Sequence, residues 1–107
     1  MSKKKISPWY LSMKNKHGKY INAVEELGRA VKEAGPLDEK ASHLIQLAAA
    51  ATLRSEGAVH SHTKRALAAG ATSKEIYHAI ILLTSTIGFP NVSAALSWCE
   101  EIIKESE

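Results

Sequence analysis

The sequence contains a single cysteine, Cys99, among its 107 residues. One thiol cannot form an intrachain disulfide, a zinc site made of several cysteines, or a Cys-x-x-Cys redox pair within one chain. Cys99 also continues a regular apolar pattern, which favours a buried, unreactive thiol. The chemistry of this chain is therefore expected to rest on other side chains.

Long apolar runs are missing as well. No segment approaches the roughly 18–20 consecutive apolar residues of a membrane-spanning helix. The N-terminal lysines are not followed by the apolar segment of a secretory signal. With 45% hydrophobic and 23% charged residues, the composition is typical of one soluble globular domain, and we expect a cytoplasmic protein.

Acidic residues are absent from the first twenty positions, which carry six lysines. The remaining positions hold eight basic and eleven acidic residues, so the net charge of +3 describes a basic leader and not a basic domain. We interpret residues 1–16 as a partly disordered, solvated leader. Within it, the aromatic surface of Trp9 and Tyr10, next to Pro8, favours docking on the folded body. Contact of the lysines with nucleic acid is the less favoured alternative.

Residues 17–107 are expected to form a single helical domain. Their apolar residues recur at steps of three and four, the spacing of amphipathic helices, and no stretch is a convincing strand. Glycine, proline and short polar residues interrupt the pattern at 35–36, 55–57, 70–72 and 88–90. The predicted fold class is thus all-α, a bundle of about five helices.

The first two predicted helices differ in how far they should be buried. The first carries one apolar stripe and ends before Gly35-Pro36. The second begins after Asp38, a good N-cap, and runs to about Arg54. Apolar residues lie on nearly all of its sides, so it should be buried nearly all round. The stripe of the first helix comprises Tyr20, Val24, Leu27, Val31 and Ala34, and the second helix contains Leu44, Ile45, Leu47, Ala48 and Leu53.

The last two predicted helices have clear start signals. Thr72-x-x-Glu75 is a capping box, and Pro90 suits the first turn of the final helix. The second and fourth helices carry more apolar surface than a five-helix monomer of this size usually covers, which indicates a homo-oligomer. The inward stripes are Ile76, Ile80, Leu83 and Ile87, thickened by Ile81 and Leu82, in the fourth helix and Val92, Ala95, Leu96, Cys99 and Ile103 in the fifth.

The densest chemistry lies in residues 54–65, which enter the third predicted helix, about 58–69. His62 shares a face of that helix with Val59, so it should point inward. His60 and His62 are about 200° apart around a helix, so they cannot ligate one metal ion together. We therefore predict no metal site.

His62 is the leading functional candidate. Small residues around an inward-facing histidine leave room for a ligand, and an imidazole can act as an acid or a base near neutral pH. The alternative is a core histidine that hydrogen-bonds a backbone carbonyl or a carboxylate. The catalytic candidates are His62, His43 and Glu56, the binding candidates are His60, Ser55 and Arg54, and no cofactor is predicted.

The run His62-Thr63-Lys64-Arg65-Ala66-Leu67-Ala68-Ala69-Gly70-Ala71-Thr72-x-x-Glu75-Ile76 resembles the carboxymuconolactone decarboxylase-like family, which includes the alkylhydroperoxidase D group. The resemblance extends over about residues 20–105. It implies an all-helical fold and assembly into trimers or hexamers. It also implies a small-molecule ligand.

The peroxidase members of that family resemble E-(x)11-C-x-x-C-x-x-x-H. With His62 as the motif histidine, the two cysteine positions are occupied by Ser55 and Ala58, and the glutamate position by His43. Serine and alanine cannot cycle through a disulfide, so we do not expect peroxidase activity. The resemblance then leaves a decarboxylase-like enzyme that moves protons, with Arg54 attracting an anionic substrate. The alternative is a non-catalytic oligomer that binds a small molecule or is purely structural.

Overall fold

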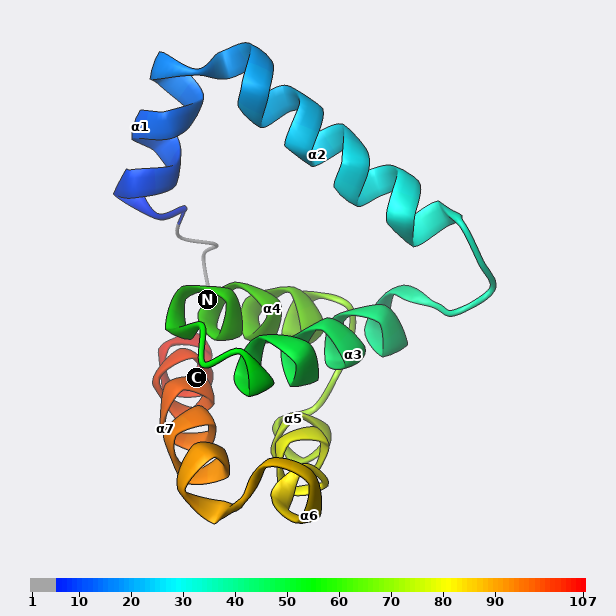
Figure 1. Ribbon diagram of the computed structural model, residues 1–107, viewed down its shortest axis with the longest axis vertical. Helices are drawn as coiled ribbons and strands as arrows, with labels where there is room; N and C mark the ends of the chain where they lie inside the picture. The colour runs from blue at the N-terminus through cyan, green and yellow to red at the C-terminus, as the bar shows by residue number, and fades with distance from the viewer. Residues whose placement is uncertain (1–5) are drawn as a thin grey trace. The chain divides into compact units, whose positions relative to one another are not determined.

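A computed structural model describes residues 6–107 of the chain (Figure 1). Within that range it contains seven helical segments and no strand, so the predicted all-α class is confirmed. No helix in these residues is both long and apolar enough to cross a membrane. The helices are α1 (Pro8–Lys16), α2 (Gly18–Glu33), α3 (Glu39–Thr52), α4 (Glu56–Ala68), α5 (Ser73–Ile81), α6 (Thr84–Ile87) and α7 (Phe89–Ser106).

The described chain divides into two compact units between Leu37 and Asp38. The predicted division into a leader at 1–16 and one helical domain at 17–107 stays a prediction. In the structure α1 and α2 form one unit, and α3–α7 form the other. The boundary follows the Gly35-Pro36 break, because a glycine and a proline together end a helix.

Helix α1 lies in the segment that was predicted to be a partly disordered leader; residues 1–5 of that leader are outside the described range. Ser7 caps the helix by accepting a hydrogen bond from the backbone N–H of Tyr10, and Pro8 occupies the first turn. The hydroxyl of Tyr10 donates to a carboxylate oxygen of Glu25 on α2 at 2.6 Å. Tyr10 therefore docks as expected, whereas Trp9 remains 70% exposed.

Helix α2 has the predicted apolar stripe, but the stripe is not buried. Tyr20, Val24, Leu27 and Val31 are all exposed, and Ile21 is the one buried residue of this helix. The apolar pattern therefore predicted the helix correctly but did not show whether other parts of the chain cover its apolar side.

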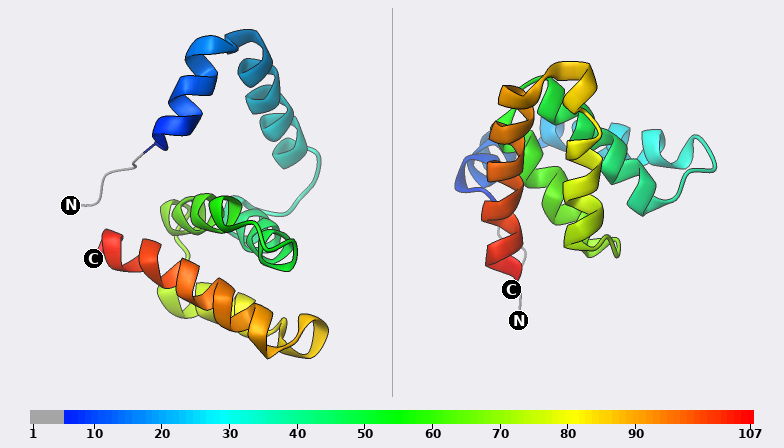
Figure 2. Two further views of the ribbon diagram at one scale, coloured as in Figure 1. Left: turned by 60° about the vertical axis from the view of Figure 1, so that its left-hand side comes forward. Right: turned by 90° about the horizontal axis from the view of Figure 1, so that it is seen from below.

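The second unit has two layers. α3 and α4 pack side by side, and α5 and α7 lie against them, as the two views of Figure 2 show. The four helices pack around a core of aliphatic side chains that are almost completely shielded from solvent. Its largest fully buried members are Leu47, Val59, Ile76, Ile80 and Val92.

Local capping explains where α3 and α5 begin. Asp38 accepts a hydrogen bond from the N–H of Ala41 at 2.8 Å, and Thr72 and Glu75 form the predicted reciprocal capping box. Lys40 on α3 reaches the Glu75 carboxylate at 3.1 Å, so the cap of α5 also connects these two helices. The start signals in the sequence were therefore read correctly.

Two predicted apolar faces are not covered within a single chain. Ile45 and Leu53, on the helix expected to be buried nearly all round, are 55% and 78% exposed, because α4, α5 and α7 cover only part of α3. Ile81 and Leu82 are also exposed, because the predicted fourth helix ends at Ile81 and the chain turns into the short α6.

The turn before α7 depends on glycine. Gly88 has a φ of +90°, a conformation that residues with a Cβ rarely adopt. Phe89 then begins α7 with Pro90 in its first turn, as predicted. The buried face of α7 consists of Val92, Ala95, Cys99, Ile102 and Ile103.

Candidate functional site

The turn between α3 and α4 carries two of the predicted binding residues. Arg54 has a φ of 55°, the left-handed conformation, and its guanidinium donates a hydrogen bond to the side-chain oxygen of Asn91 on α7. Ser55 is the N-cap residue of α4, but its side chain makes no capping hydrogen bond. Both side chains are exposed at the surface of the unit.

His43 and His62 form a pair across α3 and α4. The Nδ1 atoms of the two rings are 3.4 Å apart, and the ring centroids are 5.6 Å apart with an angle of 40° between the planes. At this separation one ring nitrogen can donate a proton and the other can accept it. The two residues are 19 positions apart in the sequence, and only the packing of α3 on α4 brings them together.

The two rings differ in burial and in their further contacts. His43 is buried, at 5% exposure, whereas His62 is half-buried and is therefore the ring that a solute can approach. The Nε2 atom of His43 lies 3.8 Å from a carboxylate oxygen of Glu39, which is one turn earlier on α3 and exposed. Glu39 was not among the predicted site residues, although its spacing of four from His43 could have indicated it.

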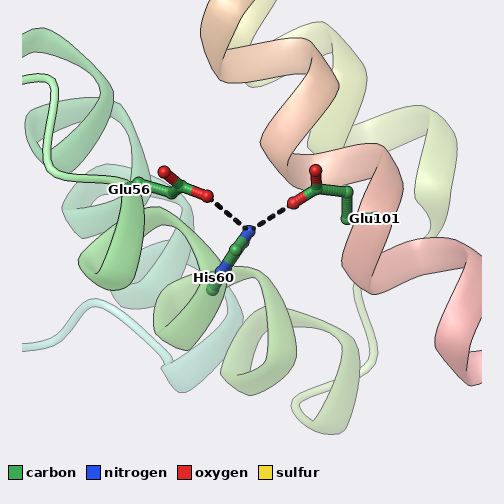
Figure 3. A group of neighbouring side chains, drawn as sticks. All are labelled: Glu56, His60 and Glu101. Atoms are coloured by element: carbon green, nitrogen blue, oxygen red, sulfur yellow. Dashed lines mark hydrogen bonds and ion pairs between the residues drawn. The ribbon is translucent and has the colours of Figure 1, made fainter.

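His60 and Glu56 belong to a different cluster, shown in Figure 3. The Nε2 atom of His60 is 2.8 Å from a carboxylate oxygen of Glu101 and 3.9 Å from one of Glu56. Glu101 was not among the predicted site residues, and no local signal in the sequence places it near α4. His60 and His62 thus contact different partners, in agreement with their 200° separation around the helix.

The inward face of α4 is centred on Thr63 and not on His62. Val59, Thr63 and Ala66 have no exposed surface, and the hydroxyl of Thr63 donates to the sulfur of Cys99 on α7 at 3.5 Å. Burial raises the pKa of the Cys99 thiol, while the hydrogen bond from Thr63 acts weakly in the opposite direction. A buried thiol with a raised pKa has little thiolate, so the structure supports the inert Cys99 expected from the sequence.

Comparison with known proteins identifies the family of this chain. Residues 19–101 match the sequence model of the Carboxymuconolactone decarboxylase family. The chain belongs to this family. It is also 34% identical over 83 residues to an uncharacterised protein of Methanocaldococcus jannaschii, a match that covers 78% of each chain.

A solved structure agrees on the fold of this family member. The ligand-free crystal structure of a carboxymuconolactone decarboxylase family protein from Legionella pneumophila matches 92% of this chain and 88% of its own, with a TM-score of 0.80. The two sequences are 20% identical, so this likeness concerns the fold alone.

In the resemblance described from the sequence, Ser55 and Ala58 align with the cysteines of the peroxidase pattern, and His43 aligns with its glutamate. The structure places His43 next to His62, so the two positions that retain acid–base side chains are also adjacent in space.

Proposed function

We propose that this member of the carboxymuconolactone decarboxylase family is a small-molecule enzyme that moves protons through His62 and His43. The observation that carries the proposal is the 3.4 Å separation of their Nδ1 atoms, with His62 half-buried and His43 buried. A general acid–base pair needs a reachable group and a second group within hydrogen-bond distance. The pair meets both requirements.

The proton transfers follow from the contacts. When His62 takes up a proton, from water or from an acidic substrate, the proton on its Nδ1 passes to Nδ1 of His43, and the reverse transfer returns it. The carboxylate of Glu39, 3.8 Å from Nε2 of His43, then stabilises the positive charge on that ring. Because the two rings are adjacent, two positively charged rings would repel each other, so the state in which the pair carries one extra proton has the lower free energy.

The substrate class that fits this chemistry is a small organic acid or lactone. In a decarboxylation the bond to the carboxylate breaks, carbon dioxide leaves, and the electron pair stays on the substrate as an enolate. The protonated His62 then gives a proton to the enolate carbon and regains one from water, so the substrate carboxylate and one proton become carbon dioxide and the protonated product without a cofactor. We further propose that the exposed Arg54 attracts the substrate carboxylate, with Ser55 beside it.

A substitution of His62 tests the proposal. His62→Gln should lower turnover at least about 100-fold on any lactone or keto acid that the wild type converts, because acid–base catalysis contributes ~10²–10⁴-fold. His78→Gln is the matched control, since His78 is exposed on α5. Carbon dioxide release and substrate absorbance are measured across a panel of small lactones, hydroxy acids and keto acids.

The same panel distinguishes the proposed enzyme from the alternative, a non-catalytic binding protein. A wild type that binds a panel member but converts none would be a binding protein on the same scaffold. Equal turnover in wild type and His62→Gln would contradict the proposed role of the histidine pair.

We also propose that the chain forms a homo-oligomer, a trimer or a hexamer. The proposal is supported by exposed large apolar side chains on several helices, which water-facing surfaces of a monomer seldom carry together. Sedimentation equilibrium should give a mass of three or six chains; a mass of one chain would contradict it. The exposed residues are Leu27 and Val31 on α2, Ile45 on α3, Leu53 after it, Ile81 and Leu82 near the end of α5, and Phe89 on α7.

A further inference from the structure

We propose that Glu56, His60 and Glu101 bind one divalent metal ion of the first transition row, for which Zn²⁺ is the probe. The ion would connect α4 to α7 at a site separate from the histidine pair. Figure 3 shows both carboxylates directed at the same imidazole nitrogen. The prediction that this segment holds no metal considered only His60 with His62, and it did not include a ligand from α7.

The donor atoms have the right types and spacing. One imidazole nitrogen and two carboxylate oxygens lie within 4.8 Å of one another. Zinc binds such atoms at ~2.0–2.2 Å, which places the ligands of a tetrahedral site about 3.4 Å apart. The separations of 2.8 Å from His60 Nε2 to Glu101 and 3.9 Å to Glu56 lie on either side of that value. Both glutamate side chains are more than half exposed, so they can rotate into place without disturbing the core.

The charges at this cluster also favour a cation. Among residues 6–107, no lysine or arginine forms an ion pair with Glu56 or Glu101, whereas the neighbouring Glu100 pairs with Lys104 at 3.1 Å. Two carboxylates face one histidine, so the cluster is negative whether the imidazole is neutral or protonated. A divalent ion would neutralise both carboxylates at once.

The backbone holds the ligands in register. Glu56 and His60 are four residues apart on α4, so they lie on one face of that helix. Glu101 comes from α7, which packs on α4, and the buried contact of Thr63 with Cys99 holds the two helices together one turn away. Only the side chains of the ligands, and not the helices, have to move on binding.

The ligand set selects among ions. Imidazole nitrogen suits zinc, copper, nickel and iron, whereas magnesium and calcium prefer oxygen ligands throughout. Three protein ligands leave at least one coordination position for water or for an oxygen of a small anion. We therefore expect Zn²⁺ to bind and Mg²⁺ and Ca²⁺ to bind far more weakly.

Equilibrium dialysis against zinc chloride tests the site, with untagged full-length protein that has been treated with a chelator and metal content measured by mass spectrometry. Wild type should bind one Zn²⁺ per chain. His60→Gln and Glu101→Gln should each weaken that binding at least tenfold. Glu100→Gln is the matched control, because it removes a neighbouring carboxylate of α7 that is not in the cluster, and its affinity should stay within twofold of wild type.

Two further measurements make the outcome decisive. Zn²⁺ should raise the melting temperature of wild type more than that of Glu101→Gln, since a ligand stabilises the fold in proportion to how tightly it binds. Cobalt(II) bound to wild type should show a visible absorption band that His60→Gln lacks. Absence of saturable zinc binding, equal binding by wild type and His60→Gln, or loss of binding in His62→Gln would each overturn the proposal. Turnover does not enter this test, so its result is independent of the proposed enzyme function.

Discussion

Nδ1 of His43 on α3 lies 3.4 Å from Nδ1 of His62 on α4, and the first ring is buried while the second is half-buried. Each ring therefore contributes something that the other lacks: His62 can be reached, and His43 is held in place by the protein around it. The two side chains should act as one functional unit.

A double-mutant cycle would show this coupling. His43→Gln and His62→Gln should each reduce turnover about 100-fold or more, and the double variant should be little worse than either single variant. The measurement is kcat/KM of all four proteins on one converted substrate. Losses that multiply in the double variant would show that the rings act separately.

Glu39 should act through His43 and not on the substrate. Glu39→Gln keeps the size of the side chain and removes the charge 3.8 Å from Nε2 of His43, so kcat should fall while KM stays nearly constant. Glu33→Gln, which changes an exposed acid at the end of α2, is the control. An equal fall in both variants would assign the effect to net charge alone.

The capping box of α5 should make the stability of the fold depend on pH in the acidic range. The pKa of Glu75 is lowered from 4.5, first by the hydrogen bond from the backbone of Thr72 and next by the one from Lys40. A carboxyl with a lowered pKa in the fold contributes stability that is present above pH 4.5 and lost as the pH falls below it. Glu75→Gln should therefore lose less stability than wild type between pH 5 and 3, measured by urea unfolding.

Removing the capping hydroxyl of Thr72 measures how much the same cap contributes to stability at neutral pH. Thr72→Ala should cost about 1 kcal/mol of unfolding free energy, and Thr72→Ser should recover most of it. A loss that serine does not recover would point to the methyl group of threonine instead of its hydroxyl.

Cys99 should be unreactive in the folded protein. It has no exposed surface and its pKa is raised from 9.0, mainly by burial, so a disulfide reagent should modify it only as fast as the protein unfolds. Stability should correspondingly fall as the pH rises above 9.0, because the unfolded thiol ionises first. Modification rates in buffer and in urea, followed by absorbance, test the first statement. A fast reaction of the native protein would contradict it.

Neighbouring isoleucines on α5 should respond very differently to truncation. Ile80 has no exposed surface and Ile81 is 50% exposed. Ile80→Ala should cost about 2–5 kcal/mol of unfolding free energy, since it leaves a cavity in the core. Measured on the dissociated chain, Ile81→Ala should change it by about 0.5 kcal/mol or less, whereas an interface at Ile81 in the proposed oligomer would raise the cost. Similar losses would mean that Ile81 is buried against another chain.

Helix boundaries were the most predictable part of this protein. Asp38, Thr72, Pro90 and the Gly35-Pro36 break act through neighbours three or four residues away, and each marks a boundary in the structure close to where it was predicted. The helix α1 was missed because its nine residues show no apolar period, and Ser7 and Pro8 were the only signals of its start.

Burial was less predictable than helix formation. Ile45, Leu53 and Ile81 satisfy the apolar pattern but remain exposed, because a repeat of three or four shows which residues share a face and not how much of the helix other helices cover. The same limit applies to Thr63, whose place at the centre of the inward face of α4 was assigned to His62.

By itself, the sequence determined the helical class, most helix ends, the family resemblance and the absence of a cysteine pair at Ser55 and Ala58. These depend on local hydrogen bonds and on residue identity. Only the tertiary structure decided which histidine meets which partner: His62 meets His43 from 19 positions away, and His60 meets Glu101 from 41 positions away. Such pairs arise from the packing of α3 and α7 on α4, and no periodicity within one helix contains that information.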